Sequence, residues 1–126
     1  MIDVDKQVAY WHSGSLEDWE VAQELIDLGR VRHALFLAHL ALEKMLKALV
    51  CRQTKSTPPR IHNLTRLVEL SGLQPSEQHS KVLAEMNRFS VEGRYTPALT
   101  APPSLAKARD YLSQTEDVLQ WLIKQL

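Results

Sequence analysis

The sequence predicts an all-α protein, an up-and-down four-helix bundle with one additional short helix, in a single domain over residues 1–126. Three observations support this prediction. Apolar residues recur at intervals of three and four in long segments, and the breaks between these segments contain most of the glycines and prolines. No segment alternates apolar and polar residues as a half-buried strand does. A chain of 126 residues also has the length of one domain.

The segment from Val31 to Val50 is the predicted centre of the bundle. Its apolar residues cover most of a helical projection, so this helix needs neighbours on several sides. The remaining sector is a polar stripe with helical spacing, formed by Arg32, His39, Glu43 and Lys47. This stripe either faces a groove or lies along an exposed seam. The alternative is an ordinary solvated stripe with Glu-Lys pairing four residues apart.

The other helices are predicted from caps and breaks. Residues 3–29 form one long helix that is weakened at Gly14, and Gly29 suits its C-terminal end. Asn63 caps a short helix that Gly72 closes, and a further helix runs from Ser76 towards Phe89 and ends before Gly93. Residues 51–62 are expected to form a loop, residues 93–104 an irregular strap, and the last helix starts at Ser104.

The composition limits the possible functions. The 15 basic and 15 acidic residues balance, which excludes a broad basic footprint for nucleic acid, so any phosphate site must be a local cluster. The single cysteine excludes an internal disulfide and a Cys-based zinc site. No signal-peptide core and no membrane span are seen, so we expect a cytoplasmic protein without membrane contact. The five histidines lack metal-ligand spacing, and we expect neither metal nor cofactor.

Two places in the sequence could bind an anion. His62 stands at a predicted helix start, where backbone amides and the helix dipole favour negative charge, although a cap or a packing role is the alternative. Arg94 and Tyr95 supply a guanidinium fork and a stacking ring on the strap. The alternative for this pair is structural, with Tyr95 in the core and Arg94 paired to Glu43.

Three motifs, taken in order, resemble the HEPN family. They are a helix with Phe36, His39, Glu43, Lys44, Lys47, Ala48 and Leu49, a helix start at His62, Asn63 and Leu64, and a strap with Arg94 and Tyr95. Many members of this family are metal-independent ribonucleases with a late motif in which a histidine follows an arginine after four to six residues. That motif is absent here, because no histidine follows His79.

The resemblance therefore implies a non-catalytic subunit. Small HEPN proteins of this kind pair with a minimal nucleotidyltransferase in modules of the toxin-antitoxin type, and we expect such a partner, a homodimer and binding of a nucleotide or RNA. Trp121, Leu122 and Ile123 cannot all face one core, which also favours self-association. The expected ligand-binding residues are His62, Arg94, Tyr95, Lys47, His39 and Glu43. The alternatives are a divergent ribonuclease that uses His62 or His39 with Arg94, and a helical adaptor without a ligand.

Overall fold

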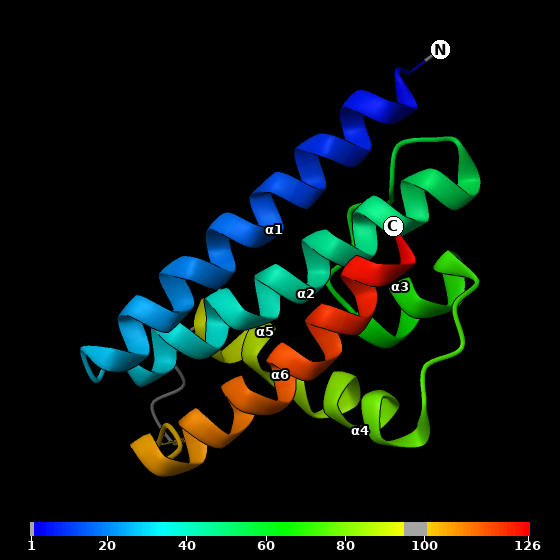
Figure 1. Ribbon diagram of the computed structural model, residues 1–126. Coiled ribbons are helices and arrows are strands. Elements are labelled where there is room, and N and C mark those ends of the chain that lie inside the picture. The colour runs from blue at the N-terminus through cyan, green and yellow to red at the C-terminus, as the bar shows by residue number, and fades with distance from the viewer. Residues whose placement is uncertain (1, 95–100) are drawn as a thin grey trace.

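Six α-helices make up the part of the chain that the computed structural model describes, residues 2–94 and 101–126. The described residues contain no strand, which confirms the all-α prediction. Figure 1 shows α1 and α2 as long rods side by side, and α2 also contacts three of the later helices, α3, α5 and α6. In chain order the helices are α1 (Val4–Asp27), α2 (Val31–Thr54), α3 (Leu64–Ser71), α4 (Glu77–Met86), α5 (Arg88–Arg94) and α6 (Leu105–Gln125).

The first two helices form an antiparallel pair. Asp3 caps α1 by accepting a hydrogen bond from the amide of Lys6 at 3.1 Å. The helix continues through Gly14 without a break, as predicted, and the hydroxyl of Ser15 donates to the carbonyl of Ala41 on α2 at 2.6 Å. Gly29 has a φ of 76°, a conformation that glycine adopts without a steric penalty, and it lies in the turn to α2.

The central position predicted for α2 is confirmed. Its largest core side chains are almost completely buried, namely Leu35, Leu42, Met45 and Leu46. The predicted end of this helix was wrong, because α2 continues past Val50 to Thr54. Cys51 still faces the core and is fully buried, and the chain leaves the helix only at Lys55, which has a left-handed backbone with φ of 57°.

The third and fourth helices begin where the caps predict. The side chains of Asn63 and Ser76 accept hydrogen bonds from the amides of Arg66 and His79. The expected single helix up to Phe89 is instead divided at Asn87 into α4 and α5. The side-chain oxygen of Asn87 accepts a hydrogen bond from the amide of Leu64 at 2.7 Å, which ties this break to the start of α3.

The fifth helix extends further than the sequence predicted. It crosses Gly93 and includes Arg94, so these two residues belong to a helix and not to the strap. A Cβ atom at residue 93 would lie only 2.1 Å from Cδ1 of Phe36 on α2. Glycine is therefore required here for the close approach of α5 to α2. Of the remaining strap, residues 95–100 lie outside the described part, and residues 101–104 are not helical.

The last helix runs in the same direction as α2, as Figure 1 shows. Surface contacts connect both ends of α6 to the first two helices. The guanidinium of Arg109 donates to a carboxylate oxygen of Asp27 at 3.2 Å near the start of α6, and Arg52 at the end of α2 donates to the carbonyl of Leu126. Ser104 caps α6 as predicted. Among its final residues Leu122 is fully buried, and Trp121 and Ile123 pack partly buried against the core. No helix in the described residues is both long enough and apolar enough to span a membrane.

Candidate anion-binding site

The polar stripe of α2 is buried at its centre. His39, Glu43 and Lys47 follow one another at four-residue spacing on one helix face, and their exposed fractions are 0%, 4% and 5%. For these three residues, both the expected exposed seam and the alternative of a solvated stripe are therefore wrong. Charged side chains are rarely buried this deeply unless they are paired.

The carboxylate of Glu43 is the centre of the cluster. The ammonium group of Lys47 donates to Oε2 at 3.1 Å, and Nδ1 of His62 lies 3.1 Å from Oε1. The buried negative charge thus has a charged partner and a second hydrogen-bonding partner from the segment before α3. Removing Lys47 would leave the buried carboxylate without its charged partner, which is strongly destabilising. Removing the ring of His62 would take away one hydrogen bond to the same carboxylate.

Lys47 is held on its other side by α1. Its Nζ atom lies 5.3 Å from the centroid of the Trp11 ring, a distance that permits a cation–π interaction. The side chain of Lys47 is only 7% exposed. In this structure Lys47 supports Glu43 and has little surface left for a ligand.

His39 is a neutral structural histidine. Its pKa is lowered from 6.5 to about 4, chiefly because burial disfavours the charged ring. The carboxylate of Glu43 and the contact with the carbonyl of His62 raise the pKa, but by less than burial lowers it. The positive charges of Arg94 and His62 lower it further. Its Nε2 atom lies 3.1 Å from the carbonyl oxygen of His62, so the neutral ring donates there and anchors the segment before α3. Nδ1 of His39 then has no hydrogen-bond partner among the described residues and lies 3.8 Å from Oε1 of Glu43.

Arg94 and the ring of His62 form the exposed edge of the cluster. Nη2 of Arg94 lies 3.3 Å from Nδ1 of His62, whose side chain is 49% exposed. Nη1 of Arg94 donates to the carbonyl and to the hydroxyl of Ser90, at 3.1 Å and 2.6 Å. The ion pair between Arg94 and Glu43, which the structural alternative predicted, is not formed, and Nδ1 of His62 contacts both groups instead.

The position of Arg94 depends on α2. The centre of its guanidinium group lies 5.0 Å from the centroid of the Phe36 ring, and the adjacent Gly93 allows this close packing. Phe36 belongs to the first family motif without a role there, and Ser90 belongs to none of the motifs. Neither residue has a local signal for such a role, because both act through contacts between helices.

The structure therefore brings together five of the six expected site residues. His39, Glu43 and Lys47 form the buried support, and His62 and Arg94 form the accessible edge. The sixth residue, Tyr95, lies outside the described residues. Arg88, a second arginine on α5, pairs with another group, because its Nε atom lies 3.4 Å from a carboxylate oxygen of Glu92.

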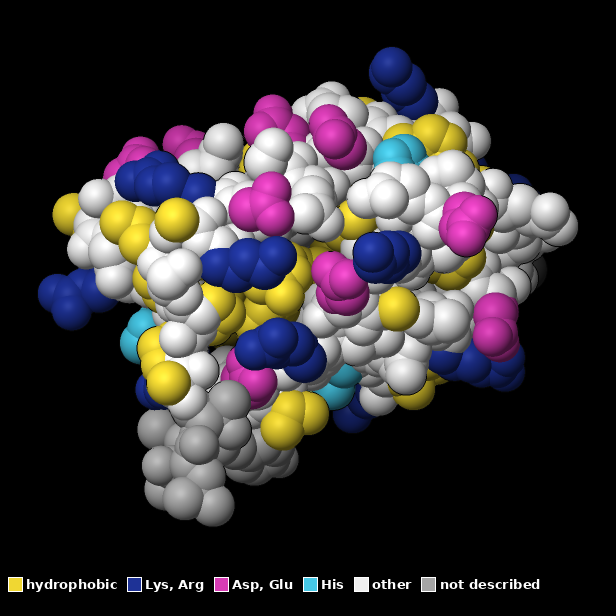
Figure 2. Space-filling view, turned by 90° about the horizontal axis from the view of Figure 1, so that it is seen from below, with side chains coloured by type: hydrophobic (Ala, Val, Ile, Leu, Met, Phe, Trp, Pro, Cys, Tyr) yellow, Lys and Arg dark blue, Asp and Glu magenta, His cyan; other side chains and the backbone are white. Residues whose placement is uncertain are grey.

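A hollow of about 280 Å³ adjoins the accessible edge. Its lining residues are His62, Asn63, Asn87, Ser90 and Val91. Within the described residues no group of three or more His, Cys, Asp or Glu side chains is arranged to hold a metal ion. Figure 2 shows basic and acidic side chains interspersed on the face that it presents, without an extended basic patch on that face.

Comparison with known proteins identifies the class of protein that this helical arrangement defines. The model of the HEPN domain matches residues 8–126. The chain belongs to the HEPN domain family. No curated protein matches it significantly.

Two crystal structures have the same fold. The protein TT1696 from Thermus thermophilus superimposes with a TM-score of 0.79 at 21% sequence identity, over 95% of this chain and 98% of the other. ST0689, described as an archaeal HEPN homologue, superimposes with a TM-score of 0.75, also at 21% identity, over 99% of this chain and 98% of the other. At this level of identity the likeness concerns the fold alone.

Proposed function

We propose that this protein is a non-catalytic HEPN subunit that binds the phosphate group of a nucleotide or of RNA between His62 and Arg94. The proposal starts from the charges of the cluster. Glu43 contributes one negative charge, which Lys47 balances at 3.1 Å. Arg94 adds a second positive charge and has no carboxylate within ion-pair distance among the described residues. The cluster therefore has one cation in excess at its accessible edge.

One observation carries the proposal: Nδ1 of His62 lies within hydrogen-bond distance of both Glu43 and Arg94. A ring nitrogen that donates its hydrogen to a carboxylate cannot accept a hydrogen bond at the same time. The buried oxygen Oε1 of Glu43 has the stronger need, because a buried acceptor without a hydrogen bond costs more free energy than an exposed donor that faces water. When His62 donates to Glu43, Nη2 of Arg94 keeps an N–H group for another acceptor, and a phosphate oxygen suits it.

The surroundings support a ligand of this kind. The hollow beside His62 has room for a small group and offers the side chains of Asn63 and Asn87. Nη1 of Arg94 is already held by Ser90, so the guanidinium is oriented before a ligand arrives. Preorganisation of this kind reduces the entropy that binding would otherwise cost.

The partner and the assembly state are part of the proposal. The resemblance to small HEPN proteins supports pairing with a minimal nucleotidyltransferase in a toxin-antitoxin-like module, and the incompletely buried Trp121 and Ile123 support self-association. The single cysteine is consistent with the reducing environment of the cytoplasm. Light scattering of the purified chain at micromolar concentration tests the homodimer, which a monomer mass at every concentration would contradict.

Titration calorimetry with AMP and with adenosine tests the anion site. We expect AMP to bind and adenosine to bind much more weakly. Arg94→Lys keeps the charge but loses the planar fork, so AMP binding should weaken about tenfold or more while the melting temperature changes little. Arg88→Lys is the matched control on the same helix, and it should leave binding unchanged. If Arg94→Lys lowers stability markedly and leaves AMP affinity intact, Arg94 is a structural residue and the adaptor alternative is favoured.

A divergent ribonuclease remains the second candidate, since the exposed ring of His62 lies beside the guanidinium of Arg94. Such a pair could transfer a proton and stabilise a phosphate in the transition state. The version that uses His39 has no support, because this side chain is fully buried. Incubation with RNA in EDTA tests the candidate, and cleavage that disappears in His62→Gln would favour it over the binding subunit.

A further inference from the structure

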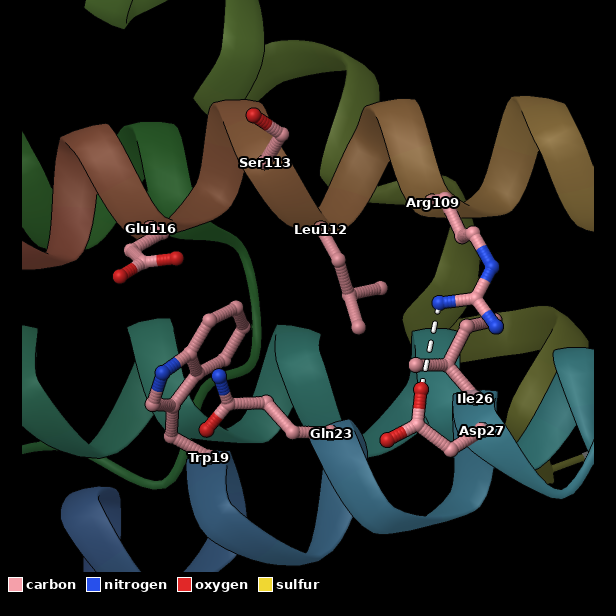
Figure 3. Close-up of a pocket in the computed structure, with 8 residues that line it drawn as sticks. All are labelled: Trp19, Gln23, Ile26, Asp27, Arg109, Leu112, Ser113 and Glu116. Atoms are coloured by element: carbon pink, nitrogen blue, oxygen red, sulfur yellow. Dashed lines mark hydrogen bonds and ion pairs between the residues drawn. The ribbon is translucent and has the colours of Figure 1, made fainter.

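A groove lies between α1 and α6, and none of its lining residues belongs to the candidate anion-binding site. It encloses about 260 Å³. Figure 3 shows Trp19 of α1 and Leu112 of α6 directed into the space between the two helices, with Gln23 and Glu116 along the same walls. The ion pair between Asp27 and Arg109, also drawn in Figure 3, connects the two walls.

Exposed leucines extend this groove beyond both ends of the hollow. Leu16 precedes Trp19 by three residues and is 42% exposed, and Leu105 precedes Leu112 by seven residues and is 43% exposed. These spacings place each leucine on the groove-facing side of its helix. From Leu16 to Ile26 the rise of α1 is about 15 Å, the length of roughly three helical turns. Trp19, Ile26 and Leu112 form the nearly buried floor of the groove, and Leu16 and Leu105 are its exposed apolar residues. The groove is long enough for a short docked helix.

The groove is acidic on its α1 side. The part of α1 that lines the groove, from Trp19 to Asp27, contains three acidic residues and no basic residue. Glu20 and Glu24 follow Trp19 and Gln23 by one residue each, are exposed, and do not line the hollow itself. On α6, Glu116 adds a further carboxylate, and Arg109 is already paired with Asp27.

These charges distinguish between possible occupants. A second copy of the chain that presented its own α1 would bring two acidic helices together, and like charges across an interface are unfavourable. A helix with basic residues on both sides of an apolar stripe would instead meet carboxylates with opposite charge. Amphipathic helices bind such grooves through residues spaced by three and four positions.

We propose that the groove between α1 and α6 is the docking surface for a basic amphipathic helix of a partner protein. Apolar residues at positions i, i+4 and i+7 of that helix lie over Trp19, Ile26 and Leu112. Its flanking lysines or arginines pair with Glu20, Glu24 and Glu116. The proposal is independent of the anion site, since the two sites share no residue.

Fluorescence anisotropy with two labelled peptides tests the proposal on the full chain. Both peptides have about 14 residues and the same leucine stripe, flanked in one by lysines and in the other by glutamates. We expect the lysine peptide to bind at least about tenfold more tightly than the glutamate peptide, with a difference that decreases as salt is added.

Variants then locate the binding surface. Ser113→Trp fills the groove from an exposed position and should lower the affinity for the lysine peptide about tenfold or more. Ser80→Trp, at an exposed position on α4, should leave this affinity unchanged. Glu20→Gln combined with Glu24→Gln should lower the affinity for the lysine peptide by a smaller factor, and Glu77→Gln on α4 should leave it unchanged. Circular dichroism checks that each variant is folded.

Three results would overturn the proposal: equal affinity for the two peptides, no difference between the two tryptophan variants, or no binding of either peptide. A chain dimer that Ser113→Trp dissociates would also overturn it, because a second copy would then cover the groove.

Discussion

The buried histidine of α2 makes the stability of the protein depend on pH. His39 is fully buried, and its pKa in the folded state is about 4, compared with 6.5 for an unperturbed ring. Between these two values the unfolded chain binds a proton that the folded protein excludes. Stability therefore decreases as the pH falls through 6.5, and the loss is complete only below about pH 4.

The size of this effect follows from the pKa difference. Each pKa unit corresponds to about 1.4 kcal/mol, so the shift of His39 amounts to ~3 kcal/mol between neutral pH and pH 4. This is a large fraction of the total stability of a small domain, which is typically about 5 to 15 kcal/mol. The cluster around Glu43 should therefore be most robust at neutral or higher pH.

Urea denaturation of the wild type and of His39→Gln at several pH values between 4 and 8 measures the effect. Glutamine keeps an N–H donor for the carbonyl of His62 but does not titrate. On acidification from pH 8 to pH 4, we expect the free energy of unfolding of the wild type to fall by ~3 kcal/mol more than that of His39→Gln. The carboxylates titrate in both proteins, so their contribution cancels in this difference. The exposed His33→Gln is the control and should behave like the wild type. Parallel curves for the wild type and His39→Gln would refute the reasoning.

Two further predictions concern packing. Leu42→Ala and Leu46→Ala should each destabilise the protein by ~2 to 5 kcal/mol, because both side chains are fully buried on α2; losses below about 1 kcal/mol in denaturant titration would contradict this placement. Gly93→Ala should cost ~1 to 3 kcal/mol, because the new Cβ would lie 2.1 Å from the ring of Phe36. Gly14→Ala provides the comparison in the same assay. Its Cβ would meet only the flexible side chain of Lys44, at 3.3 Å. We therefore expect Gly14→Ala to leave the free energy of unfolding unchanged or to raise it by up to about 1 kcal/mol. Equal losses of stability in the two alanine variants would argue against the packing of α5 on α2.

Local signals in the sequence determined most of the helical framework. The caps at Asn63, Ser76 and Ser104 act within one helical turn, and each helix begins where its cap predicts. The central position of α2 was equally readable, because a helix that is apolar on most sides must be buried. The ordered motifs also predicted the family, which the match over residues 8–126 confirms.

The interruptions of the framework were less predictable. Glycine inside a helix is usually a weak point, but Gly93 lies within α5 because the ring of Phe36 occupies the space where a Cβ would be. The α2 helix ends at Thr54 and not at the predicted Val50, and Cys51 in the added turn is buried in the core. Both results depend on contacts between segments that are distant in the sequence, and no local rule includes such contacts.

The tertiary structure alone decided how the candidate site is built. The sequence placed His39, Glu43 and Lys47 on one helix face, but the spacing is the same for a solvated stripe and for a buried one. Burial follows from the docking of α1 and of the segment that carries His62 on that face. The same docking places the ring of His62 between Glu43 and Arg94, which excludes the direct ion pair and leaves the guanidinium at the surface. Periodicity fixes which side chains share a helix face, and only long-range packing fixes what that face meets.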